Sequence, residues 1–312
     1  MIDTIARSGS FAAAARELGK VPSALTYSVR QLEEALDVLL FDRSSRQAQF
    51  TAAGTELLHE GRRLLQATGA VANRVQRVAS GWEAQLTISV DDVVSMPVMF
   101  ELVQDFCEQR DPRDGAFATA PPTRLRLRTE VLAGTWEALV TGQADLAIGV
   151  SAQTANPGGI EFLPLGDVPF VFCVAPHHPL AASVAPLTDA ELVHHRAVAV
   201  ADTAQRLAPM TINLLPGQDV LTVPTLRDKL EALLRGLGCG FLPEPLARQQ
   251  IGSGHLVVKA TSRQAAVASL HCAWRAERQT LGLGRALRWW LQRLENPITR
   301  QALLERHAGR LD

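Results

Sequence analysis

The sequence lacks a strong excess of charge of either sign. Its 312 residues contain 31 Lys and Arg against 32 Asp and Glu, which gives a net charge of −1 at pH 7. This balance excludes a highly basic coat or tail as the basis of function, so any nucleic-acid binding must come from the local placement of charge. Hydrophobic residues make up 47% and charged residues 20%, which is typical of globular proteins, and the length predicts two domains or slightly more.

Signals for export and for membrane insertion are also missing. Residues 1–20 contain no basic start followed by a long apolar run and a cleavage site. The longest uncharged stretch, residues 168–188, is interrupted by prolines. The cysteines never form a CxxC pair: Cys107, Cys173, Cys239 and Cys272. We therefore expect a cytoplasmic protein that contacts no membrane and has inert buried thiols, with a redox-sensing pair as the alternative.

No pattern for catalysis or metal binding is present. The chain has no GxSxG, HExxH or phosphate-binding glycine loop, which predicts that it is not an enzyme. Adjacent histidines occur at His177-His178 and at His194-His195, but neighbouring residues on a strand point to opposite faces. Because four converging ligands are not evident, we expect no metal site and no resident cofactor.

Residues 10–36 have the spacing of a helix-turn-helix. Ser10 is a candidate N-cap for a helix over residues 10–18, whose apolar residues share one face. Gly19 suits the end of this helix, and Pro22 suits the first turn of the next. The apolar stripe of the second helix consists of Leu25, Val29, Leu32 and Leu36.

The opposite face of the second helix has side chains suited to a DNA groove. Ser23, Thr26, Tyr27 and Arg30 are spaced i, i+3, i+4, i+7. Arginine can bond guanine with two hydrogen bonds, and hydroxyls can serve phosphates or bases. An ordinary solvated helix face is the alternative explanation of the same pattern.

The segment after this helix predicts a wing. Residues 39–54 comprise a short apolar stretch, a basic turn with Arg43 and Arg46, and a helix start at Thr51. From residue 8 to residue 54 the sequence resembles the DNA-binding domain of LysR-type transcriptional regulators. The matching residues are Gly9, Ser10, Phe11, Ala14, Ala15, Leu18, Leu32, Glu33, Leu36, Leu40, Phe41, Arg43, Thr51 and Gly54.

The resemblance implies a sequence-specific, ligand-responsive regulator that binds double-stranded promoter DNA. The family usually has Gln-Pro where this chain has Pro22-Ser23, a serine at Thr26 and often an arginine at Tyr27, so we expect the contact positions but not the operator sequence to carry over. The expected DNA contacts are Pro22, Ser23, Thr26, Tyr27, Arg30, Arg43 and Arg46. The family also begins one or two helical turns earlier, so Met1 is expected to lie inside a shortened first helix. The resulting alternative is a regulator-derived protein with impaired DNA binding.

Residues 51–80 predict one long helix with a heptad stripe. Its positions step alternately by four and three: Leu57, Gly61, Leu64, Thr68, Val71, Val75 and Val78. A helix packed on its own domain is one explanation of the stripe. We favour a dimer-forming linker helix, which the resemblance also implies. The family typically forms dimers of dimers, so self-association is expected, and the resemblance allows contact with RNA polymerase.

The remaining two-thirds predict an α/β fold. The strand-helix-strand-helix-strand order over residues 86–150 implies a parallel sheet in that part. We expect strands over residues 86–90, 124–128, 144–150, 168–175, 197–201, 238–242, 256–259 and 269–275, and helices up to about residue 110, over 134–142, over 224–236 and over 283–294. The resemblance implies an effector domain with two lobes, like that of a periplasmic binding protein. The chain is expected to cross from one lobe to the other twice. The predicted fold class is therefore α/β with an N-terminal all-α winged helix-turn-helix.

These patterns divide the chain into three expected parts. The winged helix-turn-helix covers residues 1–50, the linker or dimerisation helix 51–82, and the effector-binding domain 83–312. Within the effector-binding domain, lobe I is expected over about 83–163 and 266–312, and lobe II over about 164–265.

Loops at the carboxyl ends of strands are the expected effector site, because ligands of open α/β sheets bind there. The candidates are Asp91, Asp92, Ser95, Leu132, Thr135, Val150 and Ser151 in lobe I, and Asp202, Thr203 and Thr225 in lobe II. Many relatives have small hydroxyl residues where this chain has Asp91-Asp92. Asp92 is expected to cap the following helix. We expect a small-molecule effector that is neutral, phenolic or positively charged, or that places any carboxylate elsewhere.

Three other functions compete with a regulator. A solute-binding module for transport is disfavoured by the missing export signal and by the helix-turn-helix. An enzyme that uses the cleft lacks a catalytic constellation. A cytoplasmic small-molecule-binding module without DNA binding remains as the third alternative.

Overall fold

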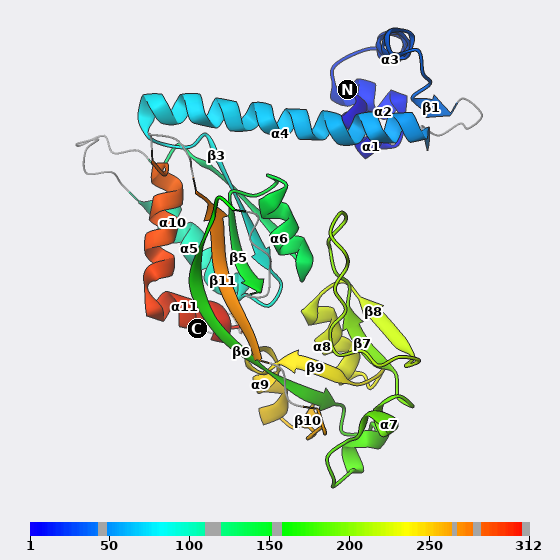
Figure 1. Cartoon of the computed structure of the whole chain (residues 1–312), viewed down its shortest axis with the longest axis vertical. Helices are drawn as coiled ribbons and strands as arrows, with labels where there is room; N and C mark the ends of the chain where they lie inside the picture. The colour runs from blue at the N-terminus through cyan, green and yellow to red at the C-terminus, as the bar shows by residue number, and fades with distance from the viewer. Residues whose placement is uncertain (43–48, 110–119, 152–157, 264–266, 277–281, 308–312) are drawn as a thin grey trace. The chain divides into compact units, whose positions relative to one another are not determined.

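A computed structural model describes residues 1–42, 49–109, 120–151, 158–263, 267–276 and 282–307 (Figure 1). The chain forms two compact units, Met1–Ala72 and Asn73–Asp312, which are described separately. Among the described residues, no helix has both the length and the apolar character needed to cross a membrane.

The first unit begins with three short helices, α1 (Ile2–Ser8), α2 (Phe11–Glu17) and α3 (Pro22–Leu36). The Ser10 hydroxyl caps α2 by accepting a hydrogen bond from the Ala13 N–H at 3.2 Å, and Gly19 takes a φ of 63° at the turn. The predicted helix-turn-helix is confirmed. Its buried core consists of Ile5, Ala14, Ala15, Leu25, Val29, Leu40 and Phe41.

A small hairpin follows the helix-turn-helix. Strands β1 (Phe41–Asp42) and β2 (Gln49–Phe50) pair antiparallel. The buried carboxylate of Glu33 in α3 accepts hydrogen bonds from the backbone N–H groups of Leu40 at 2.8 Å and Phe41 at 3.3 Å. These bonds fix the hairpin to α3. The predicted wing arginines, Arg43 and Arg46, lie outside the described residues.

The long helix α4 (Ala52–Ser80) starts as expected after Thr51. The Thr51 hydroxyl accepts a hydrogen bond from the Gly54 N–H at 3.0 Å and donates to the Leu39 carbonyl at 2.7 Å. Several large apolar side chains of the helix are between 49% and 66% exposed: Leu64, Leu65, Val71 and Val75. The described part of the chain therefore leaves this apolar surface without cover.

The second unit is built on a mixed sheet with strand order β10-β6-β11-β5-β3-β4. Strand β3 (Gln85–Asp91) runs parallel to β4 (Arg124–Glu130) and to β5 (Leu146–Ser151). Strand β11 (Val267–Arg275) runs antiparallel to β5 and to β6 (Ile160–Val174). The parallel arrangement predicted for β3, β4 and β5 is therefore confirmed. The rest of the sheet is antiparallel at β11, because the chain returns from lobe II in the opposite direction.

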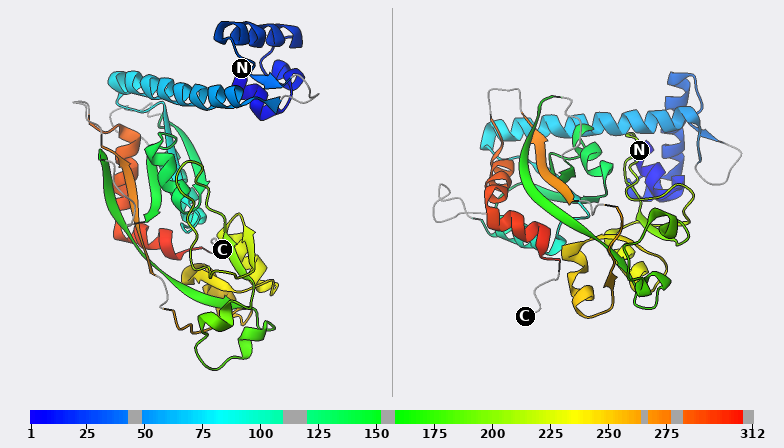
Figure 2. Two further views of the ribbon diagram at one scale, coloured as in Figure 1. Left: turned by 45° about the vertical axis from the view of Figure 1, so that its right-hand side comes forward. Right: turned by 60° about the horizontal axis from the view of Figure 1, so that its bottom comes forward.

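Strand β6 connects the two lobes (Figure 2). Up to Pro169 it pairs with β11 in lobe I, and from Phe170 it pairs with β9 (Gly240–Pro243) in lobe II. It also pairs with β10 (Val257–Val258). The sequence predicted this strand only from residue 168, because Pro164 and Gly166 interrupt the apolar pattern before that point.

Helices cover both lobes. Those of lobe I are α5 (Met96–Glu108), α6 (Ala133–Val140), α10 (Arg285–Glu295) and α11 (Pro297–Glu305). Lobe II contains η2 (Pro179–Ala182), α7 (Asp189–Leu192), β7 (Ala197–Val200), β8 (Val220–Val223), α8 (Leu226–Leu234) and α9 (Glu244–Gly252). The largest fully buried side chain in the lobe I core is Trp290 of α10. The elements α7, β8, α9 and α11 were not expected from the sequence.

The four cysteines differ in exposure. Cys107 is exposed, which corrects the expectation that all four are buried; it lies at the end of α5, next to a stretch outside the described residues. Burial raises the pKa of Cys173 and of Cys272 to about 12 and that of Cys239 to about 11. These three side chains therefore stay protonated and unreactive at neutral pH. Among the described residues, no group of three or more His, Cys, Asp and Glu could hold a metal ion.

Candidate functional site

The face of α3 opposite the buried Leu25 and Val29 is exposed. It presents every predicted DNA contact of this helix: Pro22, Ser23, Thr26, Tyr27 and Arg30. Tyr27 is 63% exposed, and its hydroxyl accepts a hydrogen bond from the Gln31 side-chain amide at 3.0 Å. Gln31 was not predicted as a contact, although its position one turn after Tyr27 places it on the same face.

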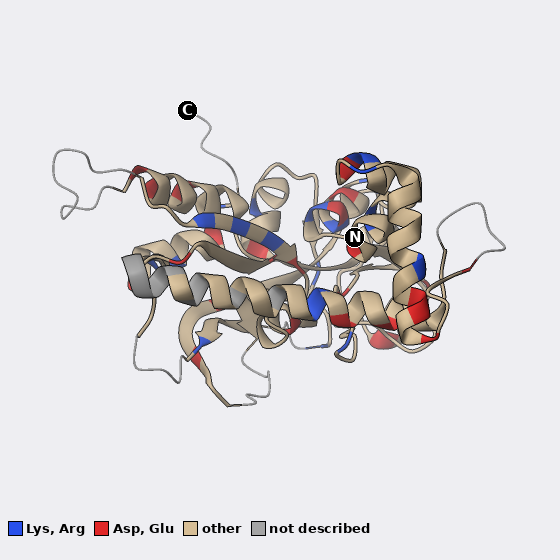
Figure 3. Ribbon diagram, turned by 90° about the horizontal axis from the view of Figure 1, so that it is seen from above, with Lys and Arg blue, Asp and Glu red and all other residues tan. Residues whose placement is uncertain are grey.

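Arg30 is held loosely. Its Nε lies 3.1 Å from a Glu34 carboxylate oxygen, and the two side chains are 68% and 66% exposed. Such exposed pairs contribute at most about 1 kcal/mol, so the guanidinium remains available for a stronger partner. Residues 1–50 contain six basic and six acidic residues, and both signs are interspersed over the first unit (Figure 3). DNA binding by this unit would therefore depend on where the cations lie and not on a net positive field.

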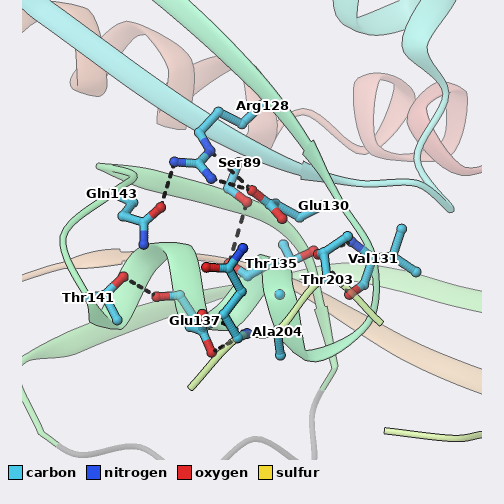
Figure 4. Close-up of polar contacts among 12 residues, drawn as sticks. Ser89, Arg128, Glu130, Val131, Thr135, Glu137, Thr141, Gln143, Thr203 and Ala204 are labelled. Atoms are coloured by element: carbon cyan, nitrogen blue, oxygen red, sulfur yellow. Dashed lines mark hydrogen bonds and ion pairs between the residues drawn. The ribbon is translucent and has the colours of Figure 1, made fainter. Parts of the chain in front are cut away.

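The second candidate site lies in the effector domain, where lobe II touches the N-terminus of α6 in lobe I. We call it the interlobe contact: residues 131–137 of lobe I against residues 202–210 of lobe II (Figure 4). Leu132 precedes α6 with a φ of 55°, and it has no side-chain cap of its own to offer. The first N–H groups of α6 therefore need acceptors from elsewhere in the fold.

Asp202 of lobe II supplies these acceptors. Its two carboxylate oxygens accept hydrogen bonds from the N–H groups of Ala133 at 3.3 Å and Gly134 at 3.2 Å. The same carboxylate also accepts from Ala204 at 2.8 Å and from Met210 at 2.7 Å within its own loop. An anion at a helix N-terminus is stabilised by the helix dipole, so lobe II provides the charge that α6 lacks.

Thr203 adds a second bond across the lobes. Its hydroxyl accepts a hydrogen bond from the Val131 N–H at 3.0 Å. A Cβ added at Gly134 would lie 1.9 Å from this hydroxyl oxygen, so Gly134 is required for the close approach of the two lobes.

Glu137 holds the following part of the loop. This buried carboxylate of α6 accepts hydrogen bonds from the N–H groups of Gln205 at 3.1 Å, Arg206 at 2.7 Å and Leu207 at 2.8 Å. Burial alone would raise the pKa of Glu137, but these backbone bonds and the Arg206 charge outweigh it and lower the pKa below its usual value. Glu137 was not predicted from the sequence; the signal was a single charged residue in a mostly apolar helix.

Asp91 lies on the lobe I side of the same helix end. One of its carboxylate oxygens accepts hydrogen bonds from the Leu132 N–H at 3.1 Å and from the Thr135 hydroxyl at 2.9 Å. The other accepts from the Val93 N–H at 3.1 Å. Three predicted effector residues, Asp91, Leu132 and Thr135, therefore meet, and the donors that could hold an external carboxylate already hold one from the chain.

Asp92 makes the reciprocal contact from lobe I to lobe II. Its carboxylate accepts a hydrogen bond from the Leu226 N–H at the start of α8, next to the predicted residue Thr225. Burial raises the pKa of Asp92, and the neighbouring Asp228 adds to this. The expectation that Asp92 caps its own following helix is wrong, because Ser95 is the N-cap of α5 and accepts from the Val98 N–H at 3.3 Å.

The remaining predicted residues lie apart from this group. Ser95 is completely buried, and its hydroxyl donates to the Arg306 carbonyl after α11. Val150 is buried in a core cluster with Trp136 and Ala273. Ser151 is exposed at the end of β5 and pairs with Leu270 of β11. The structure thus brings together Asp91, Asp92, Leu132, Thr135, Asp202, Thr203 and Thr225 at the lobe boundary, but not Ser95, Val150 or Ser151.

A pH titration tests the environment of Asp91. Burial raises the pKa of this carboxyl to about 7. In the unfolded chain it ionises near pH 4, so between pH 4 and 7 the folded state holds a proton that the unfolded state has lost, and stability falls as the pH rises through that interval. Between pH 5 and pH 8 we expect the wild type to lose roughly 2 kcal/mol more unfolding free energy than Asp91→Asn in urea denaturation.

The control for this titration is Asp105→Asn. Asp105 is half exposed and pairs with Arg293 at 3.8 Å, so this variant should keep the wild-type difference between the two pH values. Equal pH dependence in the wild type and Asp91→Asn would show that Asp91 titrates normally.

Comparisons with known proteins cover nearly the whole chain. Residues 1–55 match the family of bacterial regulatory helix-turn-helix proteins, lysR family, and residues 79–296 match the LysR substrate binding domain. The probable HTH-type transcriptional regulator YhaJ of Escherichia coli K12 is 38% identical over 94% of this chain and 93% of its own length. The HTH-type transcriptional activator AllS of Klebsiella pneumoniae is 33% identical over 81% of this chain and 91% of its own.

Solved structures show the same fold. Full-length CbnR, in a complex with its target DNA, superposes with a TM-score of 0.57 at 16% identity and covers 94% of this chain and 96% of that chain. The probable transcriptional regulator PA0477 from Pseudomonas aeruginosa has a TM-score of 0.54 at 20% identity and covers 94% of both chains.

Proposed function

The chain belongs to the LysR family of transcriptional regulators, and we propose that it binds promoter DNA through α3 and a small-molecule effector at the interlobe contact. The proposal of DNA binding rests on the exposed face of α3, which presents hydroxyl groups, one aromatic ring and Arg30. The opposite face of the helix packs into the buried core of the unit. The curated relatives are described as transcriptional regulators. A cytoplasmic location and a lack of catalytic activity belong to the same proposal.

The DNA contacts are proposed at Pro22, Ser23, Thr26, Tyr27 and Arg30, with Arg43 and Arg46 following in the wing. The Thr26 hydroxyl donates to the Pro22 carbonyl at 3.0 Å, which leaves its oxygen lone pairs free to accept from a base edge. Tyr27 and Gln31 are joined by a hydrogen bond, so their polar groups lie side by side on the exposed face of α3. In a major groove, such a helix reads base edges with its first turns.

Replacing Arg30 by alanine tests this assignment. A bidentate arginine–guanine contact discriminates by about 1–3 kcal/mol, so we expect Arg30→Ala to weaken operator binding roughly 10- to 100-fold. Binding to unrelated DNA should change much less. Fluorescence anisotropy with labelled promoter fragments measures both.

The matched control is Arg235→Ala. Arg235 of lobe II is also 68% exposed and forms the same kind of one-turn pair, with Glu231 at 2.6 Å, so its loss should leave DNA binding unchanged. Equal operator affinity of Arg30→Ala and the wild type would remove Arg30 from the proposed contacts.

Self-association is proposed through α4. Its exposed apolar residues include Leu64, Val71 and Val75 of the predicted heptad stripe, and a second copy of the helix would bury them. A dimer presents two copies of α3 to a pseudo-palindromic operator, and pairing of dimers and contact with RNA polymerase belong to the same proposal.

The effector is proposed to act by competing for the interlobe contact. The bonds of Asp202 and Glu137 join the two lobes, so a molecule that replaces either carboxylate changes the balance between closed and open lobes. Because Asp202 already binds the N-terminus of α6, an effector carboxylate would meet the negative charge of Asp202 there. This supports an effector that is neutral, phenolic or positively charged, or that places an acidic group elsewhere.

A further inference from the structure

Lobe II contains a buried cation that the effector proposal does not use. Lys229 of α8 is only 9% exposed and is the one lysine or arginine among the buried residues that the structure describes. Its side chain lies over Gly240 of β9, where an added Cβ would come within 3.2 Å of Cε and 3.4 Å of Nζ. The glycine therefore makes room for the lysine to reach the interior.

Within the described residues, no carboxylate forms an ion pair with Lys229. The groups that act on its charge are the thiols of Cys239 and Cys173. Burial lowers the pKa of Lys229 to about 8, whereas the two thiols stay neutral at that pH. Burying a charge without an opposite charge costs free energy of desolvation. A negatively charged group next to Lys229 would offset this cost.

Lys259 of the same lobe has hydrogen-bond acceptors for its ammonium group. Its ammonium donates to the Ala181 carbonyl at 3.1 Å and to the Ser183 carbonyl. Arg263, the other cation near Lys229, is paired with Asp189 at 2.6 Å. Of these three cations, Lys229 is therefore the one to which an anion would add an opposite charge.

A small cavity adjoins Lys229. Its volume is about 20 Å³, and its walls include Lys229, Cys239 and the loop residues 212–215. A cavity of this size admits one water-sized group. The neighbouring Gln218 amide is already used, because it donates to the carbonyls of Leu192 and His195, both at 2.9 Å.

We propose that this cavity binds a compact anion, either a free halide-sized ion or the acidic oxygen of a small organic acid, against the ammonium of Lys229. The site is separate from the interlobe contact. The loop between β7 and β8 touches both: Asp202 and residues 205–207 reach lobe I, whereas residues 212–215 line the cavity. An anion bound to Lys229 would thus restrain residues 212–215. The same loop contacts lobe I through Asp202 and residues 205–207.

Bromide is the probe for the free ion. In a thermal-unfolding assay of the full chain, sodium bromide replaces the sodium salt of a bulky monovalent anion at constant ionic strength. At bromide concentrations about tenfold above Kd, we expect the wild-type Tm to rise by about 2–4 °C more than that of Lys229→Met. Lys259→Met is the matched control and should respond like the wild type.

Small organic acids are the second arm, measured at one concentration in the same three proteins. A rise in Tm that depends on Lys229 with an acid but not with bromide identifies the anion as part of an organic ligand. The rise should fade as the pH increases from 7 to 9.5, because Lys229 loses its proton near pH 8 while its thiol neighbours remain neutral. Arg263 also lines the cavity, but it is paired with Asp189.

Crystals of the full chain grown with bromide provide an independent readout, in which anomalous scattering should show the ion next to Lys229 Nζ. The proposal is overturned if neither bromide nor any acid stabilises the wild type more than Lys229→Met and no anomalous peak lies at Nζ. None of these measurements uses DNA, so failure of the DNA-binding proposal would leave their outcome unaffected.

Discussion

Replacing Gly54 by alanine is expected to unfold the helix-turn-helix unit and abolish DNA binding. A Cβ at this position would lie 2.0 Å from the Leu40 carbonyl oxygen and 3.0 Å from the Phe50 ring. The backbone cannot move away cheaply, because the Thr51 N–H donates to that same carbonyl at 3.0 Å and the Thr51 hydroxyl binds Leu39. Steric overlap with fixed backbone should cost about 3 kcal/mol or more.

Gly69→Ala is the control, because it is the same substitution in the same helix with no atom within 4 Å of the added Cβ. Alanine is the better helix former by about 1 kcal/mol, so this variant should be as stable as the wild type or more stable. Urea denaturation followed by circular dichroism, together with DNA binding by anisotropy, separates the two variants. A folded Gly54→Ala chain with wild-type affinity would show that α4 does not dock against Leu40 as described.

Replacing Asp202 by asparagine is expected to release lobe II from lobe I. The carboxylate accepts four backbone N–H groups, two of them from α6, and an amide NH₂ in place of one oxygen turns two acceptor contacts into donor–donor contacts. Hydrogen bonds to a charged group contribute about 1.5–3 kcal/mol each, so we expect a loss of about 2–4 kcal/mol at the contact. Amide hydrogen exchange at Ala133, Gly134 and Met210 should become roughly 10- to 100-fold faster.

Gly134→Ala should have the same effect without changing any charge. Its Cβ would overlap the Thr203 hydroxyl at 1.9 Å and force the lobe II loop away from α6. Asp219→Asn serves as the control, because Asp219 ends the same loop but is 64% exposed and pairs with Arg196 at 2.7 Å within lobe II. If Asp202→Asn and Gly134→Ala both exchange at wild-type rates, the interlobe contact does not hold the lobes together.

Local patterns in the sequence predicted the elements whose signals are local. The Ser10 cap, the turn at Gly19 and the periodic leucines of α3 are each set by neighbours within one or two turns, and the helices formed where they were expected. Strand β6 was predicted only in part, because its first half is stabilised by pairing with β11, about a hundred residues later. The short helix α7 depends on a capping box at Thr188 and Glu191, which the apolar periodicity does not reveal.

The sequence predicted several residues of the candidate site but not the hydrogen bonds that they form. Placing ligands at the carboxyl ends of strands identified Asp91, Leu132 and Asp202. The sequence could not show that Asp202 and Asp92 each bind a helix N-terminus of the other lobe, since both contacts join segments far apart in the chain. Glu137 was missed because its partners are backbone N–H groups, and these leave no trace in residue type.

The central claim is that the chain is a sequence-specific DNA-binding regulator. Its most direct test is fluorescence anisotropy of the full chain with its promoter fragment and with a scrambled fragment, over a range of salt concentrations. The account predicts that the promoter fragment binds at least about tenfold more tightly and that affinity falls linearly in a plot of log K against log salt. Equal affinity for both fragments, or binding that is absent or insensitive to salt, would contradict it.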